Sequence, residues 1–248
     1  AWRAISQRRR VAYFEAGDMS QNQILRRLYV RLCQKPDRAF LCGSIGIPSG
    51  MCRDRTKPLP EVDRDFVNIA SPLHWEEGVA RAAKLLAKWG WGGENPLRMS
   101  IHPNSTLTVK QVDSLLDTWA RQDGFVPDVV IVDYPDIMAP EDYRLEYRHR
   151  VNETWKALRR LSQKNHCLVV VVTQSDAAAY NVAVQTKSNF SEDKRKQAHV
   201  TGMIGINRTE EDLLAGLYRL NWLVMREGGL ASGRCVHTAS CLRIGQPA

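Results

Sequence analysis

Acidic and amide side chains stand shortly after hydrophobic runs at three places in the sequence. They are Asp133 after the run 129–132, Gln174 after 168–172, and Glu15 with Asp18 after 11–14. The carboxyl ends of parallel strands meet at one edge of a sheet, where ligands bind in open α/β folds. One carboxylate there can hold a magnesium ion, another can deprotonate a water molecule, and an amide can contact a phosphate oxygen. The pattern indicates a candidate site for phosphate chemistry.

A candidate arginine stands apart from these residues. Arg226 follows the run 218–225 and precedes a pair of glycines, so it could reach the phosphate of a neighbouring subunit as an arginine finger. Every candidate also has a plain structural alternative. Arg226 can be a solvated hairpin residue, Asp133 and Asp18 can cap the next turn or helix, and Gln174 can satisfy loop backbone groups.

Strands and helices alternate along the chain and must bring these residues together. Strands are expected at residues 11–14, 97–101, 128–133 and 168–172. The last two runs lack polar alternation, which predicts burial on both faces and hence a parallel sheet covered by helices. Three further strands, at 200–206, 218–225 and 235–244, are expected to be antiparallel at one sheet edge. The predicted fold class is α/β, with a mostly parallel central sheet and antiparallel edge strands.

Helices are marked by capping signals and apolar periodicity. Capping boxes start two of them, at residues 20–23 and 108–111. A Ser-Pro pair starts a third near residue 71, and residues 140–164 carry apolar side chains at helical spacing. The expected loops are 34–61, which is rich in Pro, Gly and charge, and the polar segment 176–197.

Composition narrows the class of protein. The 248 residues are 44% hydrophobic and 25% charged, which is ordinary for a soluble globular protein and excludes wholesale disorder. No apolar run has the length needed to span a bilayer, so we expect no membrane partner. The net charge of +8 fits a polyanionic partner such as nucleic acid or nucleotide.

The six cysteines, in a chain with no secretory signal, favour free thiols in a reducing, cytoplasmic compartment. Four of them could be considered as metal ligands together with His237, namely Cys42, Cys52, Cys235 and Cys241. No pair has the C-x2-C spacing of a zinc knuckle, so zinc is not expected.

Five short motifs, in this order and spacing, resemble the RecA-like motor domain of DnaB-type replicative helicases, in particular its divergent phage-type branch. They are Asp18-Met19-Ser20 with Arg26 or Arg27 in the following helix, Asp133-Tyr134, residues 158–162, Thr173-Gln174, and residues 224–228. The resemblance covers residues 1–248 as one RecA-like ATPase domain, except for an apparent insertion at about 34–103.

The resemblance implies a P-loop NTPase core that hydrolyses ATP with Mg²⁺. Asp133 would hold the metal, Asp18 would be the first choice for the water-activating acid with Glu15 second, and Gln174 and Arg226 would contact phosphate. Arg226 would act across the interfaces of a homo-oligomeric ring, such as a hexamer.

The resemblance also implies a DNA partner and a cellular setting. Single-stranded DNA would bind loops that line the ring, and the candidates are the basic side chains that follow the strand expected at 168–172. They are Lys187, Lys194, Arg195 and Lys196. A plain solvated loop is the alternative. The setting would be the cytoplasm of a bacterium or a phage-infected host.

Three departures from the family pattern stand out. Val224 replaces the lysine that precedes the family's finger, and Pro135-Asp136 after the Asp-Tyr pair adds an acid. No G-x-x-x-x-G-K-[ST] loop occurs anywhere in the chain. Residues 1–10 resemble the end of the helix that follows such a loop, so we expect an N-terminally incomplete fold, with the loop upstream and no activity in the 248 residues alone. The strand 168–172 would then expose one row of backbone groups.

Two other functions remain open on the sequence. A RecA-like ATPase can serve recombination, packaging or regulation without unwinding DNA, and a relic can bind DNA without hydrolysing ATP. A phosphate-binding loop upstream of Ala1 would argue against the relic, and strand displacement on forked DNA would single out the helicase.

Overall fold

The computed structural model describes residues 1–54, 56–175, 182–186, 196–228 and 234–247. They form two compact units. The first comprises the described residues of Ala1–Leu25, Ala83–Gln174 and Arg195–His199, and the second those of Arg26–Ala82, Ser175–Lys194 and Val200–Ala248. The prediction that the whole chain works as one domain is not tested by this division and stays a prediction.

The first unit is built on a four-stranded parallel sheet. Its order is β4 (Leu97–Ile101), β1 (Val11–Glu15), β5 (Val129–Asp133) and β6 (Leu168–Val171). Each neighbouring pair runs parallel, and Glu15 lies opposite Asp133 on one side and Ile101 on the other. The predicted α/β class and parallel sheet are therefore confirmed, and the carboxyl ends of these strands share one edge.

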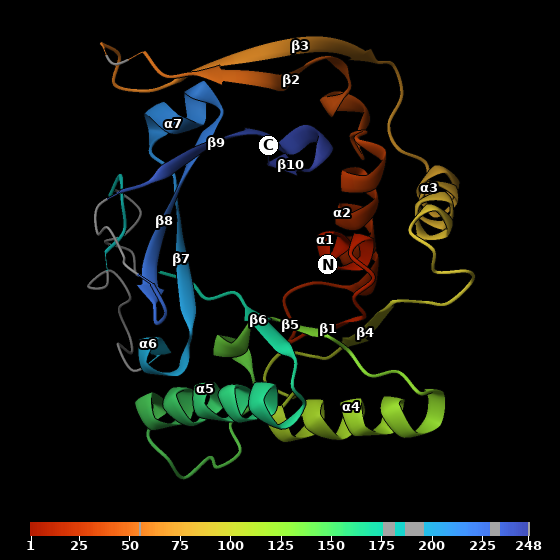
Figure 1. Cartoon of the computed structure of the whole chain (residues 1–248), viewed down its shortest axis with the longest axis vertical. Coiled ribbons are helices and arrows are strands. Elements are labelled where there is room, and N and C mark those ends of the chain that lie inside the picture. The colour runs from red at the N-terminus through yellow and green to blue at the C-terminus, as the bar shows by residue number, and fades with distance from the viewer. Residues whose placement is uncertain (55, 176–181, 187–195, 229–233, 248) are drawn as a thin grey trace. The chain divides into compact units, whose positions relative to one another are not determined.

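Helices cover this sheet on both faces (Figure 1). On one face, Phe14, Val130 and Val132 are buried against α4 (Val109–Asp123) and α5 (Tyr147–Lys164). On the other face, Val11 and Val129 pack with Ile5 of α1 (Trp2–Ser6) and with Trp91. Successive strand side chains point to opposite faces, so one uninterrupted apolar run serves both layers.

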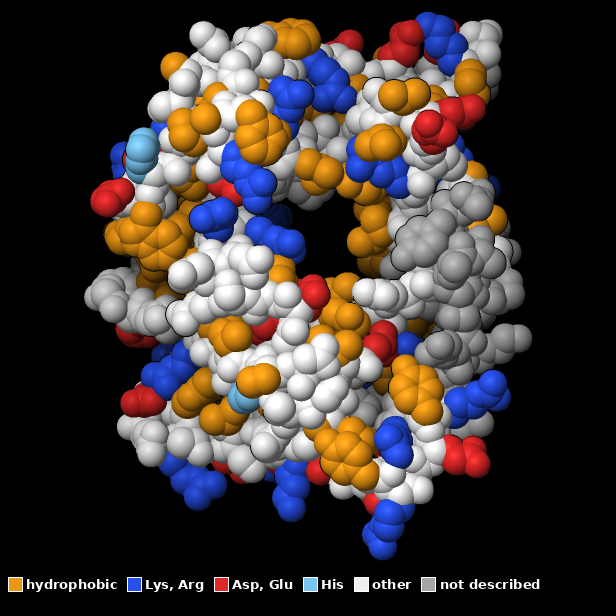
Figure 2. Space-filling view, turned by 180° about the vertical axis from the view of Figure 1, so that it is seen from behind, with side chains coloured by type: hydrophobic (Ala, Val, Ile, Leu, Met, Phe, Trp, Pro, Cys, Tyr) orange, Lys and Arg blue, Asp and Glu red, His pale blue; other side chains and the backbone are white. Residues whose placement is uncertain are grey.

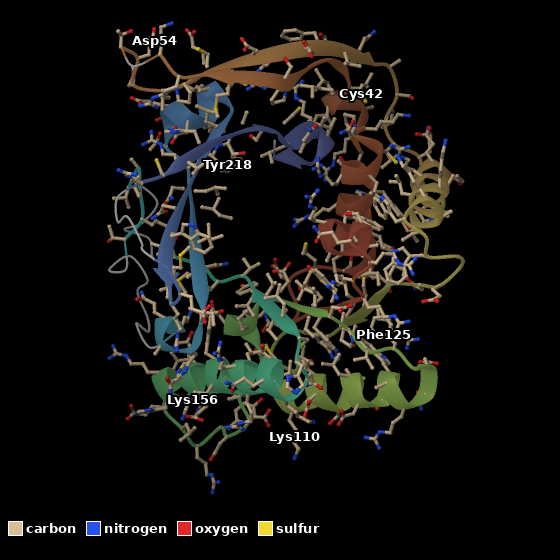
Figure 3. The ribbon with its side chains drawn as sticks, viewed as in Figure 1. Cys42, Asp54, Lys110, Phe125, Lys156 and Tyr218 are labelled. Carbon is tan, nitrogen blue, oxygen red and sulfur yellow. The ribbon has the colours of Figure 1, made fainter. Side chains whose placement is uncertain are left out.

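Two helices, α4 and α2 (Gln21–Cys33), begin where local capping predicts, whereas α5 begins at Tyr147, later than the expected start near residue 140, and without a side-chain cap. Thr108 and Gln111 form a complete capping box at α4, and Ser20 exchanges hydrogen bonds with Gln23 at the start of α2. The chain leaves α4 through Phe125, labelled in Figure 3, whose ring packs edge-on against Trp119 in the core. These caps supply partners for backbone N–H groups that a helix start leaves unpaired.

The strand β6 differs from expectation. It was expected to be buried on both faces, but Leu168 is 59% exposed and Val170 is 40% exposed, while Val169 and Val171 pack against the core. Among the described residues β6 pairs only with β5, so it is an edge strand. In the part of the chain that the structure describes, only one face of β6 is covered, by α5. Burial therefore alternates along the strand although every residue in it is apolar.

The second unit holds an antiparallel sheet of its own. Its order is β10 (Gln246–Pro247), β9 (Val236–Cys241), β8 (Leu217–Met225) and β7 (Gly202–Asn207). The three strands predicted from the sequence are antiparallel as expected, but within the described residues they form a separate sheet and do not pair with an edge of the parallel one. The short helix α7 (Glu210–Ala215) joins β7 to β8, and a capping box of Thr209 and Asp212 starts it. The ring of Tyr218 on β8, labelled in Figure 3, lies under the Arg208 guanidinium.

The expectation of a loop at residues 34–61 is wrong. After a turn of 3-10 helix (Ala39–Leu41), β2 (Gly43–Cys52) and β3 (Glu61–Ile69) form an antiparallel hairpin in the second unit. Ile45 is buried with Cys241 and Ile244, which lie nearly two hundred positions further along the chain. The glycines and prolines obscured this strand because its stabilising contacts are distant in sequence.

The remaining elements of the described residues are α3 (Trp75–Lys88), three-residue 3-10 turns at Pro135–Ile137 and Leu242–Ile244, and α6 (Lys196–His199). The predicted insertion at 34–103 includes β4, which is an integral strand of the parallel sheet. Within the described ranges, no helix combines the length and apolarity that a membrane span requires. Lys and Arg side chains are scattered over the visible face in Figure 2.

Candidate functional site

The carboxyl edge of the parallel sheet brings together the acids that the sequence singled out. Glu15 and Asp133 are the last residues of the adjacent strands β1 and β5 and stand directly opposite each other. Backbone hydrogen bonds continue past them, from the N–H of Ala16 to the carbonyl of Asp133 at 2.9 Å and from the N–H of His102 to the carbonyl of Glu15 at 3.0 Å. The edge is therefore held in register on both sides of Glu15.

Glu15 is fully buried and organises the turn that follows it. Its Oε1 accepts hydrogen bonds from the backbone N–H groups of Gly17, Asp18 and Met19 at 3.3, 2.7 and 3.0 Å. Its Oε2 is buried without a hydrogen-bond partner among the described atoms. Such an atom needs water, a cation or another donor to offset its lost solvation.

The turn can only be made with glycine at its first position. Gly17 has a φ of +117°, and an added Cβ would lie 2.2 Å from the backbone nitrogen of Asn104. This close approach places the exposed Asp18 at the rim of an open pocket of about 470 Å³. Its lining residues are Gly17, Asp18, Met19, Ser20, Ile101, His102 and Pro103. Asp18 is thus accessible to a bound molecule, whereas Glu15 shapes the turn beneath it.

Asp133 is partly buried, and its Oδ2 accepts a hydrogen bond of 2.6 Å from the Tyr13 hydroxyl. The next residue, Tyr134, lies among several carboxylates. Burial, followed by the charges of four nearby carboxylates, raises the pKa of the Tyr134 phenol. The carboxylates are Asp18, Asp136, Asp133 and Glu15. This concentration of negative charge favours a bound cation.

The donor set fits a hydrated magnesium ion better than a directly caged metal. Oxygen ligands suit Mg²⁺, which usually keeps several waters and takes one or two carboxylates from the protein. Across the described residues no three His, Cys, Asp or Glu side chains converge as a metal cage. The cysteines, Cys42, Cys52, Cys235 and Cys241 included, are all free thiols. Phosphate, in contrast, finds no glycine-rich cradle in the sequence.

Gln174 follows β6 at the same edge and is exposed. The residue before it, Thr173, donates a hydrogen bond of 2.6 Å to Asp136, which follows β5. The acid that the sequence showed as a departure after Asp133-Tyr134 therefore has a partner in the structure. This contact links the segments that follow β5 and β6.

Arg226 lies in the second unit, after β8. Its backbone N–H donates to the carbonyl of Thr201 at 3.0 Å, and its Nε donates to the carbonyl of Val200 at 2.8 Å. The side chain is exposed at the end of the strand, although its Nε is held by Val200 of the same unit. Its role as a finger stays a prediction.

Of the four basic residues expected to contact DNA, the structure describes only Lys196. Lys187, Lys194 and Arg195 lie outside the described residues. Lys196 was grouped with them as a DNA contact, but its side chain is buried, at 8% residue exposure, in an ion pair with Asp136. Its ammonium is not displayed to a ligand at the surface.

Sequence reasoning missed His102 and Tyr13. His102 is the first residue after β4, lines the pocket with Asp18, and pairs its Nε2 with the Ser100 hydroxyl at 2.7 Å. Burial lowers the pKa of His102 and so favours the neutral form of its ring. The rule that found Asp133, a polar residue directly after a strand, would also have found His102.

Solved structures share this fold. One structure, described as an ATPase domain, matches 98% of this chain and 75% of its own, with a TM-score of 0.68 and 12% sequence identity. A second, described as a DnaB-like replicative helicase and its interactions with primase, matches 97% of this chain and 50% of its own, with a TM-score of 0.65 and 11% identity. No protein-family model and no curated protein matches the sequence. The predicted RecA-like fold, of the type seen in these ATPase domains, is confirmed.

Proposed function

We propose that this chain is the ATPase domain of a DnaB-like replicative helicase, a motor that hydrolyses ATP and moves along single-stranded DNA. The observation that carries the proposal is the edge of the parallel sheet. There Glu15 and Asp133 end adjacent strands, in a fold shared with solved ATPase domains. Residues 1–248 would work as one domain in the cytoplasm of a bacterium or a phage-infected cell.

Asp133 would hold the magnesium ion, directly or through water. Bound Mg²⁺ neutralises charge that develops on the transferred phosphoryl group. The Tyr13 hydroxyl, at 2.6 Å, fixes one carboxylate oxygen of Asp133 and leaves the other available. Gln174, exposed at the end of the next strand, would contact the terminal phosphate.

Asp18 is the first choice for the acid that activates water, and Glu15 is the second. Asp18 is exposed and lines the pocket, whereas Oε1 of Glu15 is already used by three backbone N–H groups. Glu15 supports the proposal in another way, because it orients the turn that presents Asp18. The unpartnered Oε2 of Glu15 keeps the alternative open.

The active form would be a homo-oligomeric ring, for instance a hexamer, in which Arg226 reaches the nucleotide of a neighbour. DNA would contact basic residues of the segment that precedes α6, namely Lys187, Lys194 and Arg195. Such contacts release counterions, so the affinity for single-stranded DNA would fall steeply as salt increases.

A non-hydrolysing DNA-binding relic is the competing function. The two functions differ in a direct assay. The full-length gene product should hydrolyse ATP with Mg²⁺ and displace a strand from forked DNA. The 248 residues alone should do neither, because they cannot cradle the β- and γ-phosphates.

The decisive variant is Asp133→Asn in the full-length protein. It keeps the hydrogen bond from Tyr13 but removes the charge, so turnover should fall about 10²- to 10³-fold with little change in thermal stability. Asp117→Asn is a matched control, since Asp117 is a surface acid of α4 whose ion pairs are with Lys164 and Arg121. Equal turnover in the two variants would reject the proposed role of Asp133, and a wild-type protein without ATPase activity would favour the relic.

A further inference from the structure

Three polar side chains close a triangle beside the candidate site. Lys196 Nζ lies 2.7 Å from Asp136 Oδ1 and 3.1 Å from Thr173 Oγ1, and Thr173 Oγ1 donates to Asp136 Oδ2 at 2.6 Å. Asp136 follows β5, Thr173 follows β6, and Lys196 is the first residue of α6. Three segments that are distant in sequence are thus joined at one point in the first unit.

The triangle is shielded from solvent. The side chains of Lys196 and Asp136 are only 10% and 15% exposed. The ammonium also lies over the Trp155 ring, 5.7 Å from its centroid, which adds a cation–π contact. A second contact between His199 Nε2 and Asn152 Oδ1 at 2.9 Å fixes the other end of α6 on α5. The helix is therefore held at both ends against the first unit.

Attachment alone does not require buried charge. An apolar cluster of the same volume is often as stabilising as a buried ion pair, and the chain uses Leu158 and Leu161 in that way on the same helix, α5. The ion pair and its hydrogen bonds fix the orientation of the side chains, since both Asp136 oxygens and the Thr173 hydroxyl have defined partners. The residues so fixed are the immediate neighbour of Gln174 and the acid three positions after Asp133.

We infer that Lys196 is not a DNA contact but a positioning residue for the candidate site at the carboxyl edge of the parallel sheet. Its ammonium holds the ends of β5 and β6 at a fixed spacing through Asp136 and Thr173, and so sets the direction in which Gln174 leaves its strand. The inference rests on the proposed function for the identity of the reaction, but the geometry that it describes can be measured without ATP.

The first test uses hydrogen exchange of the full-length protein without nucleotide. Lys196→Met keeps much of the side-chain volume and removes the charge. It should speed exchange at the amides of residues 173–174 and 196–199 and leave the middle of β1 and β5 unchanged. Thr173→Val, which loses only the hydroxyl, should have the same local effect, and Thr173→Ser should not. Unchanged exchange at residues 173–174 in both Lys196→Met and Thr173→Val would overturn the inference.

The second test separates positioning from DNA contact. In Lys196→Met, kcat should fall about ten- to a hundredfold with the KM for ATP little changed, because misplacing a catalytic group by about 1 Å has effects of this size. The salt dependence of single-stranded DNA binding should keep its wild-type slope, whereas Lys194→Ala with Arg195→Ala should flatten it. A flattened slope with normal kcat in Lys196→Met would overturn the inference and restore Lys196 as a DNA contact.

A double variant completes the design. Asp136→Asn and Lys196→Met should each lower kcat, and the combination should lower it no further, because both remove one network. Additive losses would overturn the inference. A wild-type protein without ATPase activity would remove the proposed function instead, and the hydrogen-exchange result would then decide the positioning role by itself.

Discussion

Glu15 and Asp212 are two fully buried carboxylates, one in each unit, and they differ in how their oxygens are hydrogen-bonded. Asp212, in the first turn of α7, accepts hydrogen bonds from the backbone N–H and hydroxyl of Thr209, both at 2.9 Å, and from Arg219 Nε at 3.1 Å. Both of its oxygens have partners. Glu15 gives one oxygen to three backbone N–H groups and leaves the other unpartnered.

The difference separates a carboxylate that builds the fold from one that belongs to a candidate site. Burial alone would raise the pKa of Asp212, but the hydrogen bonds from Thr209 and the Arg219 guanidinium lower it overall. The charged form of Asp212 is thus fully accommodated by the protein. A buried oxygen without a partner costs free energy, and a fold that needed only a turn could avoid that cost, as α7 does.

The proposed role of Arg226 would contradict a simple division between the two units, because it assigns a catalytic residue to the second unit. Arg226→Ala should lower ATP turnover by about 10³-fold if the residue is a finger. Mixing it with Asp133→Asn protein should restore part of the activity, since some interfaces then pair an intact Asp133 with an intact Arg226. Turnover by the wild-type protein should also rise with concentration as rings assemble. A monomer at full rate, with Arg226→Ala neutral, would remove both the finger and the ring.

Asp18→Asn should lower turnover about a hundredfold while leaving the midpoint of unfolding near the wild-type value, because Asp18 is exposed and acts on water. Glu15→Gln keeps one acceptor for the three N–H groups, so it tests the charge without losing the turn. Asp212→Asn is the control and should retain turnover within about twofold. Normal activity in Asp18→Asn with none in Glu15→Gln would reverse the order of the two acids.

Asp212→Ala should destabilise the protein by about 2 kcal/mol, since it removes the N3 partner of the α7 capping box and leaves the Arg219 guanidinium without its carboxylate. Urea unfolding of the full-length protein measures the change. The exposed neighbour Glu211→Ala is a matched control in the same turn and should change stability little. Similar losses in both variants would show that Asp212 contributes no more than a surface residue of that turn.

The smallest expected effect is on the stability of the protein at acidic pH. The pKa of Asp212 is lower in the folded protein than its ordinary value of 3.8, so its stabilising contribution is present above that value and is lost as the pH falls through the folded pKa. Stability of the wild-type protein should therefore fall more steeply below about pH 4 than that of Asp212→Asn. Parallel pH profiles of the two proteins would contradict this account of Asp212.

Local signals explain why much of the fold was predictable. The capping box at α4 and the apolar stripe of α5, which includes Trp155 and Leu158, depend on residues within one or two helical turns. The strands β1, β4 and β5 were found from short runs of apolar residues. The same reasoning failed at β2, where Ile45 is buried by residues of the C-terminal segment, and at β6, where an edge position exposes a wholly apolar strand.

The candidate site divides along the same line. That Glu15, Asp133 and Gln174 stand at one sheet edge followed from the sequence alone, because parallel strands place their carboxyl ends together. Which oxygen of Glu15 is left unpartnered, and that Lys196 turns inward to Asp136, were decided only by the tertiary structure. Backbone geometry propagates over a few residues, whereas the ion pair joins positions 60 residues apart, and no local pattern records such a contact.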